Sequence, residues 1–448
     1  LEIIIKTSKL GGRMSTNVSA LETIHQEPMA KRQWLIVALC IGILALDGYD
    51  VLSIAFAAPG MTAEWGLSKT VLGIILPLEL VGMAFGSIIL GSVADSHGRR
   101  PTMLIGLVIL TIGMEVAALA PNIWVLGVAR VFTGIGIGGL LAAATATTSD
   151  YCNNKNRALA VTLVAGGFAF GIYAGATFLA PLLKQYDWRV TFHLGAALSL
   201  VFIPLVYFWV PETISFLERK RPTGALQRIQ QIMVKLGHSA PETLQEISEK
   251  KGEPEGTKNL FKGTMVATTC ILIFAYFGNV GTYYYFVKWL PTIVSDLGHN
   301  ASNATKVLGV ISLGGVLGSV GISVVARFAP IKILMIFCLI TAAIGVALFP
   351  YFTETLESMK VIGFITGALI FAAISGFFGL FASSFPSSLL GSGSGLVLGI
   401  GRGGAVLGPM LPGFLFAANL PLTMVALIMA TGSFIAGVTI LFLKQKAA

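Results

Sequence analysis

The sequence predicts an all-α membrane protein with twelve transmembrane helices in two six-helix bundles. Of its 448 residues, 55% are hydrophobic and only 11% are charged, whereas soluble domains usually carry about 25% charged residues. Twelve apolar runs have close to the roughly 20 residues that an α-helix needs to cross a bilayer. One long polar interval separates the first six runs from the last six, which suggests two bundles with a site between them.

The first six spans are predicted at 34–58, 70–93, 101–119, 122–148, 157–183 and 189–209. The last six are predicted at 263–288, 305–327, 331–349, 359–384, 390–416 and 420–443. The chain then divides into a cytoplasmic segment (1–33), a first bundle (34–211) and a cytoplasmic linker with a short helix or two (212–262). A second bundle (263–443) and a cytoplasmic tail (444–448) follow. We set the residues before Met14 aside as a leader, because the chain begins with Leu.

The net charge of +9 is explained by orientation in the membrane rather than by a nucleic-acid partner. With the amino terminus inside, six of the 30 Lys and Arg residues fall in external segments, two lie within spans, and the others lie in cytoplasmic segments. The six external residues are Lys69, Lys184, Arg189, Lys288, Lys306 and Lys360. Such an excess of internal positive charge predicts that both termini are cytoplasmic.

Two acidic residues, Asp47 and Asp50, interrupt the apolar first span. A charge at the bilayer centre costs roughly 2.5–3.5 kcal/mol on insertion scales, so a retained one indicates function by default. Because they are three residues apart on a helix, the two carboxylates project into one sector. The first span therefore indicates a proton or cation pathway.

Arg130 in the fourth span reaches a similar depth. At about 1.5 Å per residue, Asp47 and Asp50 lie roughly 20 and 24 Å from the inner face, and Arg130 lies roughly 18 Å from it. An unpaired charge there would be costly, so we expect an ion pair between the first and fourth spans. Protonation of an aspartate would release Arg130 during an inward–outward switch. A static buried salt bridge would also satisfy the pattern.

Arg402 is the single basic residue deep in the second half. A guanidinium can hold a carboxylate by two parallel hydrogen bonds, so we predict that Arg402 binds an anionic substrate. A role in a cytoplasmic gate or at a helix end stays open.

Tyr276, Asn279 and Tyr283 share one face of the seventh span. Aromatic rings with a few polar groups make a suitable wall for a planar ring, so we predict that these residues contact the substrate. Tyr284, Tyr285 and Trp289 are expected to be interfacial, because they lie near the outer boundary. The phenylalanines of the tenth span are expected to serve packing: Phe377, Phe378, Phe381 and Phe385.

Glycines and a few isolated polar residues complete the set of candidates. Gly167, Gly171 and Gly175 recur every fourth residue, which predicts close helix packing. Glu79 and Glu115 come out near mid-depth, so either could be an auxiliary proton site. We expect His193 to be a helix-packing residue, and the four cysteines to be apolar filler without a metal-binding role.

The loop after the second span reads G-S-V-A-D-S-H-G-R-R-P. An acid followed by two arginines at a cytoplasmic helix end can bridge neighbouring helix termini, whereas positive-inside anchoring would explain only the arginines. The string resembles the loop motif G-x-x-x-D-R-x-G-R-R of the major facilitator superfamily, with Ser96 in place of the first arginine. We predict a gating role for Gly91, Asp95, Gly98, Arg99 and Arg100.

Further motifs resemble the aromatic acid:proton symporter branch of that superfamily. They are D-G-Y-D in the first span, R-V-F-T-G-I-G-I-G-G at 130–139, P-E-T after the sixth span, W-L-P-T at 289–292 and G-R-G-G-A-V-L-G-P at 401–409. The resemblance covers Trp34 to Leu443 and implies the major facilitator fold. Sugar porters usually repeat the loop motif where this chain reads A-R-F-A-P-I-K, and many drug antiporters carry a G-P-x-x-G-G that its fifth span lacks.

The resemblance also implies roles for individual residues. It implies an aspartate–arginine couple for proton symport, with Asp50 favoured as proton acceptor because sugar porters place their aspartate at the matching position of G-Y-D. Asp47 would be a second carboxylate beside it. Asp150, Arg157 and Glu212 resemble a cytoplasmic charge relay of the family that latches one conformation.

We therefore predict a monomeric symporter of the bacterial inner membrane that imports an aromatic carboxylate, such as a benzoate or hydroxybenzoate, with protons. No catalytic triad, metal cluster or nucleotide-binding loop is apparent, so we expect no enzyme activity and no cofactor beyond the coupling proton. Muconate or an aliphatic carboxylate stays open as substrate, because Arg402 would recognise the carboxylate and not the ring. Sugar transport, efflux by antiport and a signalling receptor are less favoured functions that also stay open.

Overall fold

A computed structural model describes residues 19–244, 260–261, 263, 265–386 and 389–443, and within these ranges the only regular structure is helical. Twelve stretches of helix there are long and apolar enough to cross a membrane, which confirms the predicted number of spans. The helices of the first half are α2 (Lys31–Trp65), α3 (Lys69–Ile75), α4 (Leu78–His97), α5 (Arg99–Ala118), α6 (Ile123–Tyr151), α7 (Arg157–Leu182) and α8 (Val190–Trp209). Those of the second half are α11 (Met265–Asp296), α12 (Ala301–Val325), α13 (Ile331–Leu348), η2 (Phe349–Phe352), α14 (Leu356–Ser384), α15 (Leu390–Ala417) and α16 (Leu422–Leu441).

Some helices differ in length from the predicted spans. α3 and α4 together make the second span, and the break between them falls at Leu76 and Pro77, because proline lacks the N–H that a helix interior needs. α2 continues past the predicted boundary at residue 58 to Trp65, and it ends where Gly66 takes a left-handed φ of 60°. α11 likewise continues to Asp296 instead of ending near residue 288.

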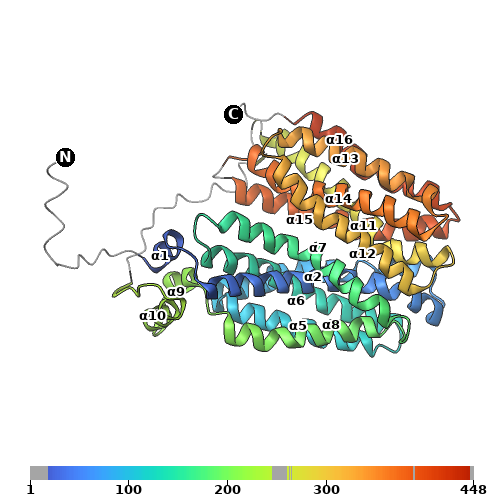
Figure 1. Ribbon diagram of the computed structural model, residues 1–448. Helices are drawn as coiled ribbons and strands as arrows, with labels where there is room; N and C mark the ends of the chain where they lie inside the picture. Colours follow the sequence, from blue (N-terminus) through green and yellow to red (C-terminus); the bar gives the residue numbers. More distant parts are fainter. Residues whose placement is uncertain (1–18, 245–259, 262, 264, 387–388, 444–448) are drawn as a thin grey trace.

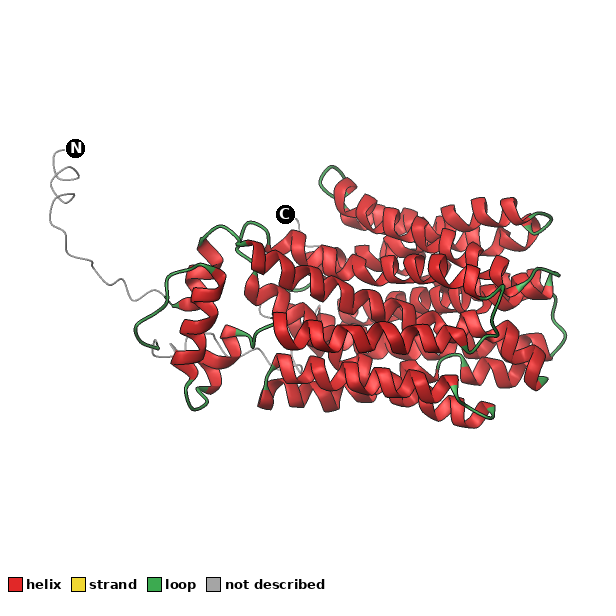
Figure 2. Cartoon of the chain, turned by 60° about the horizontal axis from the view of Figure 1, so that its bottom comes forward, coloured by secondary structure: helices red, strands yellow, loops and turns green. Residues whose placement is uncertain are grey.

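The two halves of the chain lie side by side. In Figure 1 the helices of the first half, coloured blue to green, occupy one side of the bundle, and those of the second half, yellow to red, occupy the other. Three short helices lie at one end, where the chain also enters and leaves: α1 (Ala20–Gln26), α9 (Ile214–Lys220) and α10 (Ala225–Leu236). Figure 2 shows that these short helices lie beyond one end of the bundle of long helices. We call the end of the bundle that carries α1, α9 and α10 the basic end, and the other end of the bundle the opposite end.

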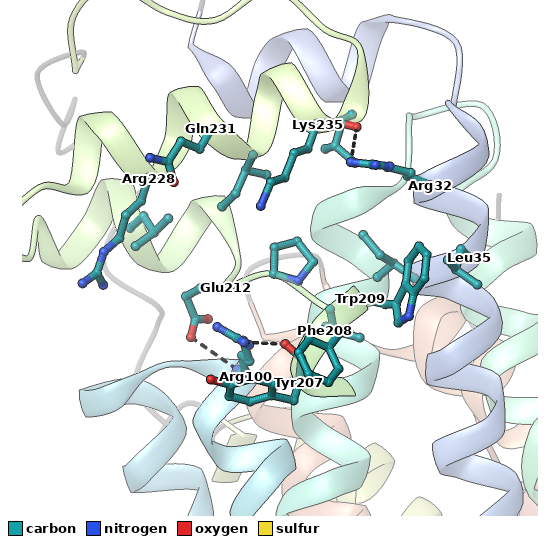
Figure 3. A pocket seen from close by; sticks show the side chains of 16 residues that line it. Arg32, Leu35, Arg100, Tyr207, Phe208, Trp209, Glu212, Arg228, Gln231 and Lys235 are labelled. Atoms are coloured by element: carbon teal, nitrogen blue, oxygen red, sulfur yellow. Dashed lines mark hydrogen bonds between the residues drawn. The ribbon is translucent and has the colours of Figure 1, made fainter. Parts of the chain in front are cut away.

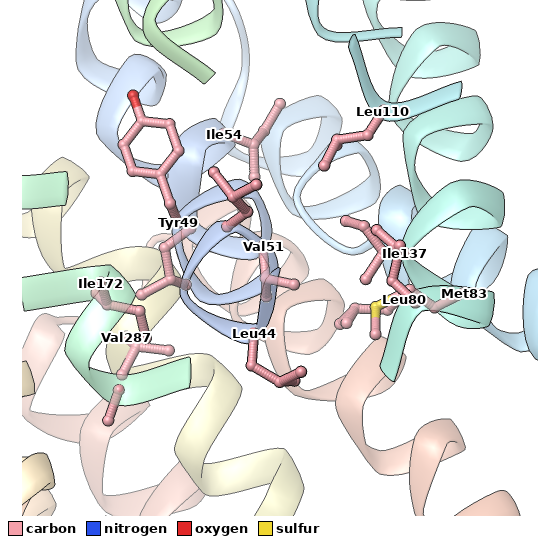
Figure 4. Close-up of a cluster of buried hydrophobic side chains, with 14 of the residues drawn as sticks. Leu44, Tyr49, Val51, Ile54, Leu80, Met83, Leu110, Ile137, Ile172 and Val287 are labelled. Carbon is pink, nitrogen blue, oxygen red and sulfur yellow. The ribbon is translucent and has the colours of Figure 1, made fainter. Parts of the chain in front are cut away.

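α2 runs through the packed interior of the first half. In Figure 4 its Leu44 and Val51 lie between Ile172 on one side and Leu80 on the other. These four side chains are almost completely shielded from solvent. Because α2 is covered on every side at this depth, its aspartates lie inside the protein and not against lipid.

Close approach of helix backbones depends on glycine, as the sequence predicted for the fifth span. A Cβ added at Gly171 on α7 would come within 1.9 Å of the Ala45 carbonyl oxygen on α2. A Cβ at Gly134 on α6 would come within 2.0 Å of the Glu79 carbonyl oxygen on α4. Any larger residue would separate these helix pairs, so the glycines set the distance between the elements that carry the buried charges.

Candidate transport site

Arg130 on α6 joins two carboxylates from different helices. Its Nη1 donates to Asp50 Oδ1 at 2.6 Å, and its Nη2 donates to Glu79 Oε2 at 3.2 Å and to the Asp50 carbonyl oxygen at 2.8 Å. All three side chains are at most 1% exposed. The expected ion pair between the first and fourth spans is therefore present, and Glu79 takes part in it.

Lys288 on α11 extends this network across the interface between the halves. Its ammonium donates to Glu79 Oε1, to the Val51 carbonyl oxygen at 2.9 Å and to the Leu76 carbonyl oxygen at 2.8 Å. The side chain is completely buried. Its assignment to an external segment was wrong, because α11 continues for eight residues beyond Lys288, which is about 12 Å of helix.

A cavity of about 290 Å³ lies between the halves, beside this network. Asp47 on α2 and Arg402 on α15 are among its lining residues, so one carboxylate and one guanidinium from different halves face the same space. Arg402 Nη1 donates to Ser87 Oγ at 2.6 Å, and Asp47 Oδ1 has no hydrogen-bond partner among the described residues. The cavity therefore offers one strong donor group and one unpaired acceptor.

Aromatic rings form much of the remaining wall. Tyr276, Tyr283 and Tyr284 on α11, with Phe371 and Phe378 on α14, line the cavity. The Tyr283 hydroxyl has no hydrogen-bond partner within the described ranges. Rings from two helices around a guanidinium can hold a planar aromatic anion by its faces and its carboxylate.

Several predictions about aromatic and polar residues need correction. Asn279 is not among the residues that line the cavity, because its carboxamide oxygen accepts a hydrogen bond from Ser433 on α16. Tyr284 lines the cavity and Trp289 is buried, donating to the Pro409 carbonyl oxygen at 2.7 Å, so neither is interfacial. The same is true of Tyr285, which is 2% exposed. α11 packs against α2, α15 and α16, and its residues 285–294 are all buried.

Of the remaining predictions about single residues, some are confirmed and others are wrong. Phe377, Phe381 and Phe385 are buried packing residues as predicted, whereas Phe378 lines the cavity. Glu115 lies apart from the network: it is about half exposed and pairs with His193 at 3.1 Å, so that histidine has a polar partner.

The loop motif surrounds the start of α5. Glu212 accepts hydrogen bonds from the backbone N–H groups of Arg99 at 2.8 Å and Arg100 at 3.3 Å. Gly98 has a φ of 111°, and a Cβ there would lie 2.2 Å from the Glu212 carboxylate, so only glycine allows this approach. Asp95 pairs with Arg99 at 3.3 Å and with Arg219 on α9 at 3.7 Å. A carboxylate at a helix N-terminus is favourable, so Glu212 ties the linker to α5.

Within the described ranges, Arg157 does not form the charge relay with Asp150 and Glu212 that was expected. Arg157 donates to the Ser149 carbonyl oxygen and to His25 on α1, and among the described residues it forms no ion pair with Asp150 or Glu212. Burial, with the nearby Arg157 guanidinium, lowers the pKa of the His25 imidazole. A Cβ at Gly91 would meet nothing within 4 Å, so this glycine makes no close approach in this conformation.

A family model of the Major Facilitator Superfamily matches residues 38–401. The chain belongs to this superfamily. It is therefore a transporter and not an enzyme, and its twelve spans make it a multi-pass membrane protein.

Relatives with similar sequences include transporters that are named for aromatic acids. A 4-hydroxybenzoate transporter, PcaK, from Pseudomonas putida is 31% identical over 86% of this chain and 86% of its own length. A gallate transporter from the same species is 28% identical over 95% of this chain and 94% of its own. The solved inward-open conformation of the xylose transporter XylE from Escherichia coli aligns with a TM-score of 0.71 at 17% identity, covering 93% of this chain and 97% of that one. The predicted fold and the relation to aromatic acid transporters are confirmed.

Besides Tyr284 and Phe378, two residues were missed as site residues: Lys288 and Ser87. Lys288 could have been noticed, because it is one charge between the apolar segments Y-Y-Y-F-V and W-L-P. A serine in an apolar span is common, so nothing in the sequence marked Ser87 as a partner of Arg402.

Proposed function

We propose that the protein is a proton-coupled symporter that imports a small aromatic carboxylate, of the benzoate or hydroxybenzoate kind, by alternating access. The observation that carries the proposal is the cavity between the halves, where Arg402 faces aromatic rings close to the buried network around Arg130. The relatives named for 4-hydroxybenzoate and gallate support the same substrate class. We place the protein in the bacterial inner membrane with the basic end in the cytoplasm, in keeping with the distribution of its basic residues.

The substrate carboxylate would pair with Arg402, and its ring would lie among Tyr276, Tyr284 and Phe378. Among the described residues, only one guanidinium nitrogen of Arg402 is engaged, by Ser87 Oγ and, at 3.4 Å, the Met83 carbonyl oxygen. The rest of the fork can therefore accept a carboxylate. The Tyr283 hydroxyl, which has no partner within the described ranges, would bond a hydroxyl on the ring. An aliphatic acid would leave that hydroxyl unpaired at a cost of about 1–3 kcal/mol, which favours a hydroxylated ring.

Charge balance supports one proton per substrate anion. The acids in and beside the cavity are Asp47, Asp50 and Glu79. They are matched in number by the bases Arg130, Lys288 and Arg402. A bound monoanion adds one negative charge to this balanced set, and one proton restores neutrality. We assign that proton to Asp50, because its loss of charge leaves Arg130 a second carboxylate, Glu79, as partner. One proton with a monoanion is electroneutral overall, so the membrane potential should not drive the uptake.

Contacts between the halves support an arrangement closed at the opposite end. Lys69 pairs with Asp296, and Ser302 Oγ donates to the Ala180 carbonyl oxygen at 2.6 Å. A Cβ at Gly73 on α3 would lie 2.9 Å from Gly413 Cα on α15, so these helices touch. Towards the basic end, a Cβ at Gly395 or Gly399 on α15 would meet nothing within 4 Å. In this conformation the cavity would therefore communicate with the cytoplasm.

Uptake into proteoliposomes tests the proposal. An inwardly directed proton gradient should drive accumulation of radiolabelled 4-hydroxybenzoate, and a potential imposed with valinomycin should leave the rate unchanged. Muconate and xylose serve as competitors of other substrate classes, and neither should reduce uptake. Alkaline-driven expulsion would indicate an antiporter, and binding without counterflow would indicate a receptor; either result would refute symport.

A further inference from the structure

A second cavity, of about 800 Å³, lies at the basic end between α10 and the ends of α2 and α8 (Figure 3). Four basic residues line it from three helices: Arg32 on α2, Arg100 on α5, and Arg228 and Lys235 on α10. Glu212 is the single acidic residue in its lining. None of these side chains reaches the cavity that holds Arg402, so the second cavity is separate from the proposed transport site.

The basic groups in the lining of this second cavity outnumber the acidic ones, four against Glu212. Both Glu212 carboxylate oxygens are engaged by backbone N–H groups at the start of α5. Arg32 donates to the Lys235 carbonyl oxygen at 3.0 Å and Arg100 to the Tyr207 carbonyl oxygen at 2.5 Å, and both acceptors are uncharged. Arg228 and Lys235 form no ion pair within the described ranges. Guanidinium and ammonium groups that outnumber the carboxylates around them are suited to bind a phosphate.

The opposite wall of the cavity belongs to the membrane boundary. It is formed by the last residues of α8, Tyr207, Phe208 and Trp209, which are 54%, 76% and 50% exposed, and by Leu35 near the start of α2. Exposed aromatic residues at the end of a spanning helix mark the level of the lipid headgroups. Arg100 lies over the Tyr207 ring at 5.0 Å, so the cationic and aromatic walls meet.

We propose that this cavity binds the headgroup of an anionic phospholipid of the cytoplasmic leaflet. The phosphate would lie among Arg32, Arg228 and Lys235, and the acyl chains would leave along α8 past Phe208. Basic clusters directly beside a spanning helix attract anionic lipids. A soluble phosphate would use the same cations, but it would gain nothing from the exposed aromatic wall, which therefore favours a lipid. The bound lipid would hold the linker helix α10 against α2 and α5. The inference does not depend on what the transport cavity carries.

Lipid binding to the purified full-length protein in detergent tests this assignment. We expect phosphatidylglycerol, titrated against a phosphatidylcholine background, to raise the thermal midpoint and to remain bound in native mass spectra. The double variant R228Q/K235Q should bind phosphatidylglycerol about 30-fold more weakly, the fold change for two basic groups that contribute about 1 kcal/mol each near an anionic surface. The matched control K155Q/R327Q removes two exposed charges elsewhere at the basic end and should bind as the unmodified protein does.

Two further arms separate the possible sources of the phosphate. The variant F208Q removes part of the apolar wall, so it should weaken phosphatidylglycerol binding without any loss of charge. Inorganic phosphate and glycerol phosphate should not compete at concentrations similar to the lipid. Equal competition by these soluble anions, unchanged binding in R228Q/K235Q, or an equal loss in K155Q/R327Q would each overturn the proposal.

Discussion

The Asp50 side chain shares a buried guanidinium with a second carboxylate. Arg130 holds Asp50 at 2.6 Å and Glu79 at 3.2 Å, so two carboxylates compete for one cation. Isolated charges of this kind are not retained in a low-dielectric interior unless they are paired. We propose that neutralising Asp50 shifts Arg130 towards Glu79, which would keep the guanidinium paired throughout a repeated cycle.

The variant Asp50→Asn should lose proton-driven accumulation and keep exchange of substrate across the membrane. The amide mimics a permanently protonated carboxyl, so the switch no longer depends on pH. Uptake under a pH gradient should fall to the passive level, whereas counterflow from preloaded proteoliposomes should persist. The control Glu115→Gln, in which the altered residue pairs with His193 outside the network, should transport normally. Full gradient-driven uptake by the Asp50 variant would remove Asp50 from the proton pathway.

The variant Arg402→Lys should bind substrate roughly 10- to 150-fold more weakly, since it loses one charge-assisted hydrogen bond of about 1.5–3 kcal/mol. Lysine keeps the charge but not the planar fork that matches a carboxylate. Isothermal titration with 4-hydroxybenzoate on the purified variant gives the affinity, and Arg327→Lys, at an exposed position, is the matched control. An affinity equal to that of the unmodified protein would favour a gating role for Arg402.

At the scale of helices, backbone contact sets the position of the charged groups. Gly171 brings α7 against α2, the helix that carries both aspartates, and Gly134 brings α6 against α4. Each approach is closer than any side chain would permit. The missing side chains therefore let the helix backbones come close enough for the Arg130 ion pairs with Asp50 and Glu79 to form.

Gly171→Ala should destabilise the protein by about 1–3 kcal/mol, the usual cost of inserting a methyl group into a packed interior. The added Cβ would lie 1.9 Å from the Ala45 carbonyl oxygen, and backbone cannot move aside as a flexible side chain can. The thermal midpoint in detergent reports the change. Gly321→Ala on α12 makes the same replacement where nothing lies within 4 Å, and it should leave the midpoint unchanged. Equal midpoints for both variants would contradict the proposed close packing.

Attachment of α1 should weaken under acidic conditions. Burial lowers the pKa of His25 in the docked state, so the released helix binds a proton more readily than the docked one. The contribution of neutral His25 to docking is present above the ordinary pKa of about 6.5 and is lost as the pH falls through the lowered value. Hydrogen-exchange protection of α1 amides should therefore drop between pH 7.5 and 5.5, after correction for intrinsic rates. The variant His25→Gln should abolish that difference.

Features that depend on one or two helices could be predicted from the sequence, and features that depend on tertiary packing could not. The twelve spans, the Asp50–Arg130 pair and the Gly171 contact depend on hydrophobicity, depth and spacing within one or two helices, and these properties can be read along the chain. The buried position of Lys288 depends on where α11 ends. The position of Asn279 outside the cavity depends on which face of that helix packs against α16. Both are consequences of tertiary packing. Because α11 touches both halves, a helical-face pattern alone could not separate its cavity side from its packing side.

For the whole molecule, the completely buried Lys288 joins the two halves deep in the interior. Lys288 belongs to the second half, yet its three hydrogen-bond acceptors all belong to the first. Two of them are carbonyl oxygens at α2 and at the break between α3 and α4. Under the proposed alternating access, an outward-facing conformation would require these bonds to break. We infer that protonation of Asp50 assists this step, because Arg130 then competes with Lys288 for Glu79.

Lys288→Met should therefore shift the molecule towards conformations open at the opposite end. Methionine has an unbranched apolar side chain slightly shorter than that of lysine, but it cannot bond Glu79, which retains Arg130 as partner. Spin labels at Tyr186 and Lys306, one exposed residue of each half near that end, should show a longer distance population in the variant. Lys360→Met removes a partly exposed lysine that pairs with Glu357 within the second half, and its label distances should match those of the unmodified protein. If the Lys288 variant also keeps the original distribution at low and high pH, Lys288 is a static packing contact, and closure of the opposite end depends on the Lys69–Asp296 pair and the helix contacts around Gly413.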